Sequence, residues 1–345
     1  MTNTATIILP EDAKKYTQLM ETYDVVIIGG GVAGLSAGIY TARDGFKTLI
    51  LEGEYESSVE MPGGALLLTS SIENFPGFKE GAGEELVNVI RDQAETFGAE
   101  IVTAKASAVE FATENCELHI VHSGETSYRA KSVIITTGAI ARQLNVPGEA
   151  ELYGRGVSSC ATCDGFFFKD KTVAVVGGGD TAVEDALFLR RFAKQIYLMP
   201  RRNDLRAKGP EAREAILLDE EPDSNFDILW SSTVETVNSN GEHVSGLTYK
   251  DGNANLVNLE LDGIFVAIGR DPATNFLTGS GVHVDDEGYI LTEANSTKVM
   301  GRPVGVFAAG DAVDRVFRQA ITSAGRAVEA ALEARTYLLT AKRLS

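Results

Sequence analysis

Two cysteines separated by two residues form the part of this sequence best suited to chemistry. Cys160 and Cys163 stand in the run Ser159-Cys160-Ala161-Thr162-Cys163-Asp164-Gly165. Cysteines at this spacing can close a small, reducible disulfide, and the thiolate of such a pair forms more easily than that of a lone cysteine. Asp164 directly follows the second sulfur, so a carboxylate lies beside a group that must gain and lose protons. The run therefore predicts thiol–disulfide exchange with Asp164 as its acid–base group. The alternative role for Asp164 is that of a turn residue.

A structural zinc half-site is the alternative interpretation of the cysteine pair. Zinc takes four ligands, usually two such pairs or one pair with histidines at short spacing. The chain of 345 residues contains only 3 cysteines and 4 histidines. The third cysteine, Cys116, lies in a strand-like run without a cysteine neighbour, so we expect a packed thiol there and no metal site.

A glycine-rich signature near the start of the chain predicts a dinucleotide site. Residues 23–28 are an apolar, β-branched run typical of a buried parallel strand. The next six residues, Gly29-Gly30-Gly31-Val32-Ala33-Gly34, match G-x-G-x-x-G, and a helix is predicted to follow them as far as about Asp44. A second strand, 47–51, ends at Glu52. The glycines let the backbone approach a pyrophosphate at the helix N-terminus, and the acid accepts the ribose hydroxyls.

A second signature begins thirteen residues after the dithiol motif. A buried strand, 172–176, leads into Gly177-Gly178-Gly179-Asp180-Thr181-Ala182, of the form G-x-G-x-x-A, and then a helix to about 192 and a strand over 195–199. Where the first unit has an acid, this unit has three arginines: Arg201, Arg202 and Arg206. Guanidinium groups at this position select a 2′-phosphate, so the unit is predicted to bind NADPH. The alternative is a solvated basic turn.

The intervening segments complete two similar halves. A helix over 84–97 is followed by an antiparallel excursion that returns to the sheet at 132–136, and a helix over 210–218 by a matching excursion that returns at 262–269. The expected strands of the two excursions are 101–102, 108–111, 118–121, 228–229, 244–249 and 256–261. The chain is therefore predicted to be α/β, with one βαβ half nested inside the other.

A last strand, 304–309, leads to Gly310 and Asp311, and a helix with Arg318 near its start is predicted to reach about 339. An aspartate at the carboxyl end of a strand, beside a helix N-terminus, is well placed to hold a cofactor's ribityl chain and ring.

Composition and charge exclude several classes of protein. The chain is 44% hydrophobic and 23% charged, which is typical of a globular protein. Its formal charge is −18, from 31 basic and 49 acidic side chains, so nucleic acid and anionic membranes are not expected partners. No apolar run reaches the length of a membrane span, and the first 22 residues resemble neither a signal nor a transit peptide. They are predicted to form a polar extension with one short helix, 12–21. Three cysteines, two in a cycling pair, suit the cytosol.

From about Tyr23 onward the chain resembles the low-molecular-weight thioredoxin reductases, the class II pyridine nucleotide-disulfide oxidoreductases. It carries, in that family's order, G-x-G-x-x-G, E-N-F-P-G-F, C-A-T-C-D-G-F-F, G-G-G-D-T-A, R-R-x-x-x-R and F-A-A-G-D…R-Q-A-I-T-S-A-G. The resemblance implies a cytoplasmic homodimer that takes hydride from NADPH onto FAD and reduces the disulfide of thioredoxin through Cys160 and Cys163.

The resemblance also implies a domain plan and a set of ligand-binding residues. Two Rossmann-like domains of three-layer ββα type are expected, with the NADPH domain, 143–268, inserted between the parts of the FAD domain, 23–142 and 269–345, after an N-terminal extension, 1–22. The residues expected to hold FAD are Gly29, Gly31, Val32, Ala33, Gly34, Glu52, Gly64, Asn74, Thr137, Gly138, Gly310, Asp311, Arg318, Gln319 and Ala320. Those expected to hold NADPH are Gly179, Asp180, Thr181, Arg201, Arg202 and Arg206.

Two positions depart from the family pattern. Ala65 replaces a glutamine that many members have beside the flavin, and Pro200 replaces a histidine that often precedes the two arginines. Larger disulfide reductases use a histidine–glutamate pair in a C-terminal domain. No histidine follows His283 here, so Asp164 is the best placed acid–base group.

Because the dithiol lies in the inserted unit, nicotinamide and disulfide must take turns at one flavin face. Rotation about two linkers, near 137–145 and 269–275, would allow this.

Phe166 and Phe167 are candidates to receive an aromatic side chain of the partner, or else core residues. Three other functions stay open: a dithiol oxidase that passes electrons to oxygen, a reductase of another thioredoxin-like protein, and a redox-sensing nucleotide-binding module without turnover.

Overall fold

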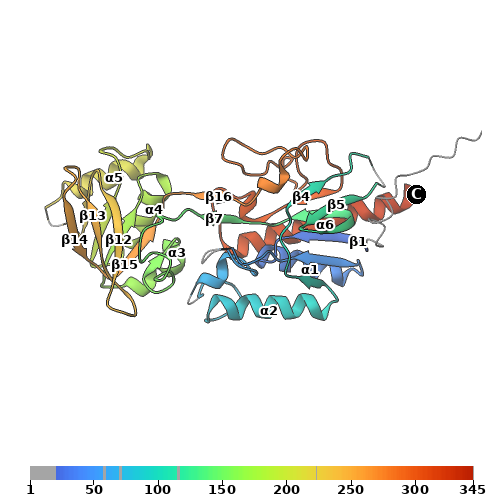
Figure 1. The fold of residues 1–345 in the computed structure, drawn as a ribbon, viewed down its shortest axis with the longest axis horizontal. Helices are drawn as coiled ribbons and strands as arrows, with labels where there is room; N and C mark the ends of the chain where they lie inside the picture. The colour runs from blue at the N-terminus through green and yellow to red at the C-terminus, as the bar shows by residue number, and fades with distance from the viewer. Residues whose placement is uncertain (1–20, 57–59, 70–71, 115–116, 223, 345) are drawn as a thin grey trace, which may run out of the picture.

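Two lobes joined by a narrow ribbon make up the molecule (Figure 1). The computed structural model describes residues 21–344 except 57–59, 70–71, 115–116 and 223. The expected helix 12–21 and the expected packed thiol Cys116 therefore lie outside the described residues, apart from Glu21. The ribbon consists of β7 (Ala139–Ala141) and β16 (Arg270–Pro272), which pair antiparallel. Both chain crossings between the lobes thus run side by side, at the two predicted linkers.

The first lobe is built on a seven-stranded sheet in the order β3-β2-β1-β6-β5-β4, with β17 also paired to β6. Helices α1, α2 and α6 pack on one face of this sheet. The strands are β1 (Thr22–Ile28), β2 (Thr48–Leu51), β3 (Glu100–Val102), β4 (Ala108–Glu110), β5 (His119–Ser123), β6 (Thr126–Ile135) and β17 (Val306–Ala308). The helices are α1 (Val32–Arg43), α2 (Gly83–Thr96) and α6 (Ala320–Leu344), with 3₁₀ turns η2 (Ala65–Leu68), η4 (Asn275–Leu277) and η5 (Gly310–Ala312).

The second lobe lies between β7 and β16 in sequence, so it is an insertion into the first. A parallel sheet, β11-β10-β9-β15-β8, is flanked by helices on one face and by an antiparallel sheet, β12-β13-β14, on the other. Its strands are β8 (Val157–Ser158), β9 (Thr172–Val176), β10 (Gln195–Met199), β11 (Phe226–Ile228), β12 (Thr233–Ser239), β13 (Val244–Lys250), β14 (Leu256–Glu260) and β15 (Gly263–Val266). Its helices are α3 (Ala161–Asp164), α4 (Asp180–Leu189) and α5 (Pro210–Asp219), with a 3₁₀ turn η3 (Gly165–Phe168).

The apolar runs form the central strands because both of their faces are buried. In β1, Val25 and Ile27 pack under the helices, whereas Val26 and Ile28 pack on the opposite side of the sheet. Alternate side chains of a strand point to opposite faces, so a continuous apolar run suits a sheet covered on both sides. β9 repeats this arrangement in the second lobe. The predicted α/β fold with two Rossmann-like units, one inserted into the other, is confirmed.

Two local expectations were wrong. β3 and β11 were expected in the antiparallel excursions, but each pairs parallel with the strand before its helix. A strand–helix–strand crossover places the second strand parallel to the first, which explains both cases. β12 was not anticipated. Within the described residues, no helix is both long and apolar enough to cross a membrane.

Candidate active site

The two cysteines lie at the start of a single helical turn in the second lobe. β8 leads to Ser159, Cys160 caps the N-terminus of α3, and the amides of Cys163 and Asp164 both donate to the Cys160 carbonyl, at 3.3 and 3.1 Å. This turn brings the two sulfurs together in a disulfide with an S–S distance of 2.08 Å. The described residues contain no cluster of side chains that could hold a metal ion.

Asp164 is held next to the disulfide by a serine from β8. The hydroxyl of Ser158 donates to Oδ2 of Asp164 at 2.6 Å and accepts the amide of Cys160 at 3.1 Å. Oδ1 of Asp164 is buried without a hydrogen-bond partner among the described residues. Burial raises the pKa of Asp164, and the Ser158 hydrogen bond opposes this shift. The side chain therefore keeps its proton to a higher pH than an exposed aspartate, as a general acid requires.

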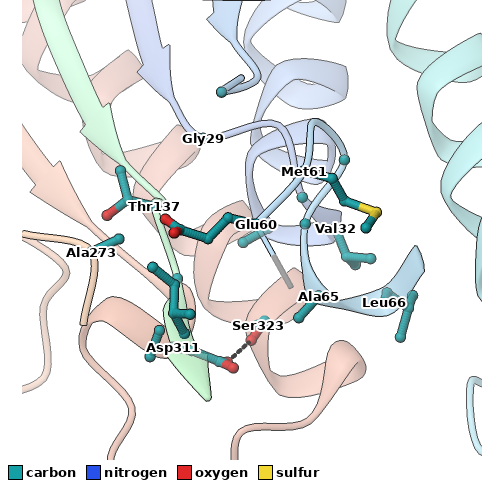
Figure 2. A pocket seen from close by; sticks show the side chains of 18 of the residues that line it. Gly29, Val32, Glu60, Met61, Ala65, Leu66, Thr137, Ala273, Asp311 and Ser323 are labelled. Atoms are coloured by element: carbon teal, nitrogen blue, oxygen red, sulfur yellow. Dashed lines mark hydrogen bonds between the residues drawn. The ribbon is translucent and has the colours of Figure 1, made fainter. Parts of the chain in front are cut away.

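A single cleft connects the first glycine signature with the disulfide. Figure 2 shows Val32, Glu60, Thr137 and Asp311 around this space. Of the residues expected at a flavin, those lining the cleft are Gly29, Gly31, Val32, Ala33, Glu52, Gly64, Asn74, Thr137, Gly138, Asp311, Arg318, Gln319 and Ala320. Cys160, Cys163 and Asp164 line it too, and so does Ala65. Gly34 and Gly310 do not line the cleft. Gly34 packs against the carbonyl of Gly29, and Gly310 packs against Ala33.

The glycine turn leaves the N-terminus of α1 open toward the cleft. Gly29 has φ +114°, and a Cβ at this position would lie 2.3 Å from the carbonyl oxygen of Thr136, so only glycine fits. Gly31 caps α1 without a side-chain hydrogen bond, and the first turn contains no acid. The free amides of this turn are therefore available to an anionic group such as a pyrophosphate.

The ribose acid Glu52 is fixed by two residues that the sequence did not indicate. Thr103 donates to Oε1 of Glu52 at 2.6 Å, and Arg91, from α2, forms an ion pair with Oε2. The Glu52 side chain is only 6% exposed. A buried carboxylate needs such partners, because moving the charged group out of water without them costs on the order of several kcal/mol. Glu52 is thus oriented before any ligand arrives.

Asp311, in the 3₁₀ turn η5, lines the same cleft and is bonded to a serine of α6. Ser323 donates to its Oδ1 at 2.8 Å (Figure 2). Burial raises the pKa of Asp311, while Ser323, Arg270 and Arg318 oppose the shift. Arg318 itself adopts a left-handed conformation, with φ +49°, and donates to the hydroxyl of Tyr289.

The second glycine signature lies outside this cleft. Gly179 caps α4 without a side-chain hydrogen bond, and Asp180 and Thr181 begin the helix. The guanidinium of Arg206 lies beside Gly179, where a Cβ would be 3.3 Å from one of its nitrogens. Arg201 and Arg202 follow β10 and are exposed. None of the three arginines forms an ion pair with another described residue. Pro200 packs against Gly178, so this departure from the family pattern is accommodated within the turn itself.

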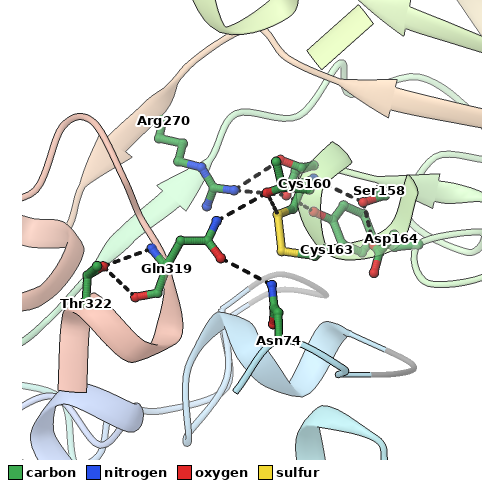
Figure 3. The surroundings of a disulfide bond; sticks show 11 residues. Asn74, Ser158, Cys160, Cys163, Asp164, Arg270, Gln319 and Thr322 are labelled. Carbon is green, nitrogen blue, oxygen red and sulfur yellow. Dashed lines mark hydrogen bonds between the residues drawn. A yellow bond between two sulfur atoms is a disulfide. The ribbon is translucent and has the colours of Figure 1, made fainter. Parts of the chain in front are cut away.

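Two side chains of the first lobe and its ribbon, Gln319 and Arg270, bond to the dithiol turn (Figure 3). The amide nitrogen of Gln319 donates to the Thr162 hydroxyl at 3.2 Å, and Gln319 accepts a hydrogen bond from Asn74 at 3.4 Å. Arg270, in β16, donates to the carbonyl of Ser159 at 3.1 Å. Neither Arg270 nor Thr162 was among the predicted site residues. Their contacts span more than 100 residues of sequence, so no local pattern could have indicated them.

Comparison with known proteins agrees with this geometry. The sequence pattern of the family described as Pyridine nucleotide-disulphide oxidoreductase matches residues 23–331. The chain therefore belongs to that family, and within it to the thioredoxin reductases.

Three relatives illustrate the similarity. A thioredoxin reductase of Streptomyces clavuligerus is 43% identical over 322 residues, covering 93% of this chain and 95% of the relative. The structure of the Streptococcus pyogenes thioredoxin reductase is 34% identical, with a TM-score of 0.82, over 92% of this chain and 99% of the other. The Lactococcus lactis enzyme, solved in a state designated the FR conformation, has the same identity and coverages but a TM-score of 0.61.

Proposed function

We propose that this protein is an NADPH-dependent thioredoxin reductase that uses FAD. The observation that carries the proposal is that the Cys160–Cys163 disulfide lines the same cleft as the first glycine turn. A disulfide placed there can exchange electrons with a redox group in the cleft. When bound, FAD would accept a hydride from NADPH and supply an electron pair to the disulfide.

The cleft fits FAD at each of its parts. The open N-terminus of α1 suits the pyrophosphate, the oriented carboxylate of Glu52 suits the adenosine ribose, and Asp311 suits the ribityl chain. The Cβ of any other residue at Gly29 would collide with the sheet that supports this turn. We assign residues 23–142 and 269–345 to the FAD domain and 143–268 to the NADPH domain.

NADPH is assigned to the second glycine turn because of the arginines beside it. Arg201, Arg202 and Arg206 are exposed in a chain of charge −18 and form no ion pair within the described residues. A 2′-phosphate would provide the counter-charge that the protein does not. The assigned contacts also include Gly179, Asp180 and Thr181.

Reduction of the flavin by NADPH requires another arrangement of the lobes, since the second glycine turn lies outside the cleft. The two solved relatives support such a change: at equal identity and coverage, the relative in the FR conformation has a TM-score of 0.61 against 0.82 for the other. Two relatives of equal sequence identity are expected to differ in TM-score when their lobes are similar but are placed differently relative to each other. We assign the rotation to the ribbon of β7 and β16, within the linkers 137–145 and 269–275.

Thiol exchange completes the reaction. A thiolate of the reduced pair attacks a sulfur of the partner disulfide, so that a mixed disulfide forms and one partner thiolate leaves. The second cysteine then attacks the mixed disulfide, which restores the Cys160–Cys163 bond and releases the second partner thiolate. Asp164 is the group placed to protonate a leaving thiolate. In the overall reaction, NADPH, one proton and the partner disulfide are converted to NADP⁺ and the partner dithiol.

Thioredoxin is the partner we propose, and its docking would involve the surface beside the motif. Phe166 and Phe167 are 62% and 38% exposed, so they are available to an aromatic side chain of the partner. The same assignment includes a homodimer that acts in the cytoplasm.

The test is anaerobic NADPH oxidation by purified holoenzyme, with and without thioredoxin. Cys160→Ser and Cys163→Ser should each abolish thioredoxin reduction while leaving bleaching of the flavin by NADPH intact. Cys116→Ser, which replaces the third cysteine, is the matched control. No bleaching by NADPH in this assay, together with oxygen consumption in a parallel aerobic assay with a dithiol, would instead identify a dithiol oxidase. Extraction of FMN, or of no flavin, would overturn the cofactor assignment.

A further inference from the structure

We propose that Arg270 is a positioning residue for the dithiol: its guanidinium holds Ser159 in place and supplies a fixed positive charge for the reduced cysteine pair. This goes beyond the roles assigned to Cys160, Cys163 and Asp164. It relies on the proposed function only in that the pair cycles between disulfide and dithiol.

Geometry places Arg270 at the junction of both lobes and the cleft. It stands at the first position of β16, paired with Ala141 of β7, where the chain leaves the inserted lobe. From there its side chain turns to the dithiol turn, as Figure 3 shows. Nη2 donates to the carbonyl oxygen of Ser159 at 3.1 Å and approaches the Ser159 hydroxyl at 3.5 Å. Ser159 immediately precedes Cys160, so the guanidinium bonds to the residue next to the first cysteine.

A second hydrogen bond restricts the same residue. The hydroxyl of Tyr153 donates to the Ser159 hydroxyl at 2.6 Å, and Tyr153, Ser159 and Arg270 all line the cleft together with both cysteines. Ser159 is therefore held on both sides, by a neutral phenol and by a cation. The two contacts order the backbone entering the motif, but only Arg270 carries charge.

The surroundings of Arg270 contain acids whose pKa values are raised by burial. Burial raises the pKa of Asp164 and Asp311, and it raises the pKa of Asp185, on α4, to about 7. The charge of Arg270 opposes this rise at Asp185 and at Asp311. A guanidinium retains its charge at any pH at which proteins are folded. The charged or titratable groups that line the cleft beside the dithiol, or that interact with those groups, include Tyr153, Glu149, Asp164, Glu184, Asp185, Asp311, Asp314 and Arg318.

Such a cation favours the anionic form of a nearby thiol. An opposite charge within a few ångström typically shifts a pKa by about 1–3 units toward the charged form. Thiolate is the form that attacks a disulfide, so a permanent cation keeps the reduced pair reactive near neutral pH. No histidine is needed for this role, which agrees with the lack of one in the motif.

The experiment measures the pH at which the reduced pair becomes reactive. Holoenzyme reduced anaerobically with NADPH is alkylated with iodoacetamide between about pH 5 and 9, and the rate at Cys160 and Cys163 is followed by peptide mass spectrometry. Arg270→Met keeps the apolar stem and removes the charge. Its reactivity profile should move up by about one pH unit, so that alkylation on the acid limb slows about tenfold. Arg270→Lys should restore most of the profile.

Matched variants separate charge from structure. Arg142→Gln removes one positive charge on the same ribbon, where Arg142 pairs with the exposed Asp271 carboxylate outside the cleft, and it should leave the profile unchanged. Tyr153→Phe removes the neutral contact to Ser159 and should move it far less than Arg270→Met. An unchanged profile in Arg270→Met, an equal shift in Arg142→Gln, or equal shifts in Arg270→Met and Arg270→Lys would each overturn the proposal. Because the readout needs no thioredoxin, it is independent of the partner assignment.

Discussion

The two glycine turns of this molecule have similar backbone packing, but the side chains beside them carry opposite charges. In the first, Gly29 has φ +114°, and a Cβ there would lie 2.3 Å from the Thr136 carbonyl oxygen. In the second, Gly177 has φ +151°, and a Cβ would lie 2.4 Å from the carbonyl oxygen of Ala267. Each turn opens a helix whose N-terminus has no side-chain cap. The two turns therefore share a tightly packed glycine and an uncapped helix N-terminus, although the first turn of α4 contains Asp180 and that of α1 contains no acid.

The difference begins after the second strand of each unit. Glu52 is buried and already bonded to Thr103 and Arg91, whereas Arg201 and Arg202 are exposed and form no ion pair within the described residues. Under the proposed function, the first site is completed by the protein, as suits a cofactor that stays bound. The second would be completed only by its ligand, as suits a substrate that must leave after each turnover. Selectivity thus resides in a few side chains outside the shared turn.

Removing the exposed arginines of the second site should abolish its preference for NADPH over NADH. This is the largest effect that we expect. Arg201→Ala combined with Arg202→Ala should lower the NADPH-to-NADH ratio of kcat/KM by roughly two to four powers of ten. Each charge-assisted contact to the 2′-phosphate contributes about 1.5–3 kcal/mol. Steady-state kinetics with both nucleotides provides the measurement. Arg191→Ala, beyond the opposite end of α4, is the control, and an unchanged ratio in the double variant would show that the arginines do not read the phosphate.

Removing the ion pair that orients Glu52 in the first site should have a smaller effect, on the affinity for FAD. Arg91→Met leaves the buried Glu52 with Thr103 as its remaining partner, so the carboxylate is less well oriented for the ribose. We expect FAD affinity to fall about 10–100-fold, the equivalent of losing one charged hydrogen bond. Titration of apoprotein with FAD, followed by flavin fluorescence, measures this directly. Arg43→Met, at the exposed end of α1, should bind FAD normally. Equal affinities for both variants would mean that Glu52 needs no orienting partner.

Asp164 belongs to the second unit, but it lines the cleft that contains the first glycine turn. Since burial raises its pKa, the protonated acid persists to higher pH than usual and is lost as the pH rises through that raised value. Asp164→Asn should lower thioredoxin turnover by about tenfold or more and remove the alkaline decline that this deprotonation causes. Flavin bleaching by NADPH should stay near normal in stopped-flow measurements. Asp170→Asn, on an exposed turn, serves as control. Full turnover in Asp164→Asn would leave it as a turn residue only.

Local patterns allowed most of this architecture to be predicted, because both nucleotide signatures, the main strands and the dithiol are contiguous in sequence. The sequence did not indicate how distant segments meet. The parallel pairing of β3 and β11 depends on the crossover through a helix, and short strands carry little periodicity of their own. Arg91, which pairs with Glu52, lies 39 residues from it, and Arg270, which bonds to Ser159, lies 111 residues from it. The orientation of these side chains and the charges around them arise only from tertiary packing.

The ribbon between the lobes has a consequence for how such a protein can be assembled and altered. Ala141 and Arg270 are direct partners in an antiparallel ladder. Antiparallel strands at this spacing can be joined by a two-residue hairpin turn. The inserted lobe is therefore a removable module, whose excision would leave two chain ends already in register for a short join. The same site would accept a different module without altering the sheet that carries the first glycine turn.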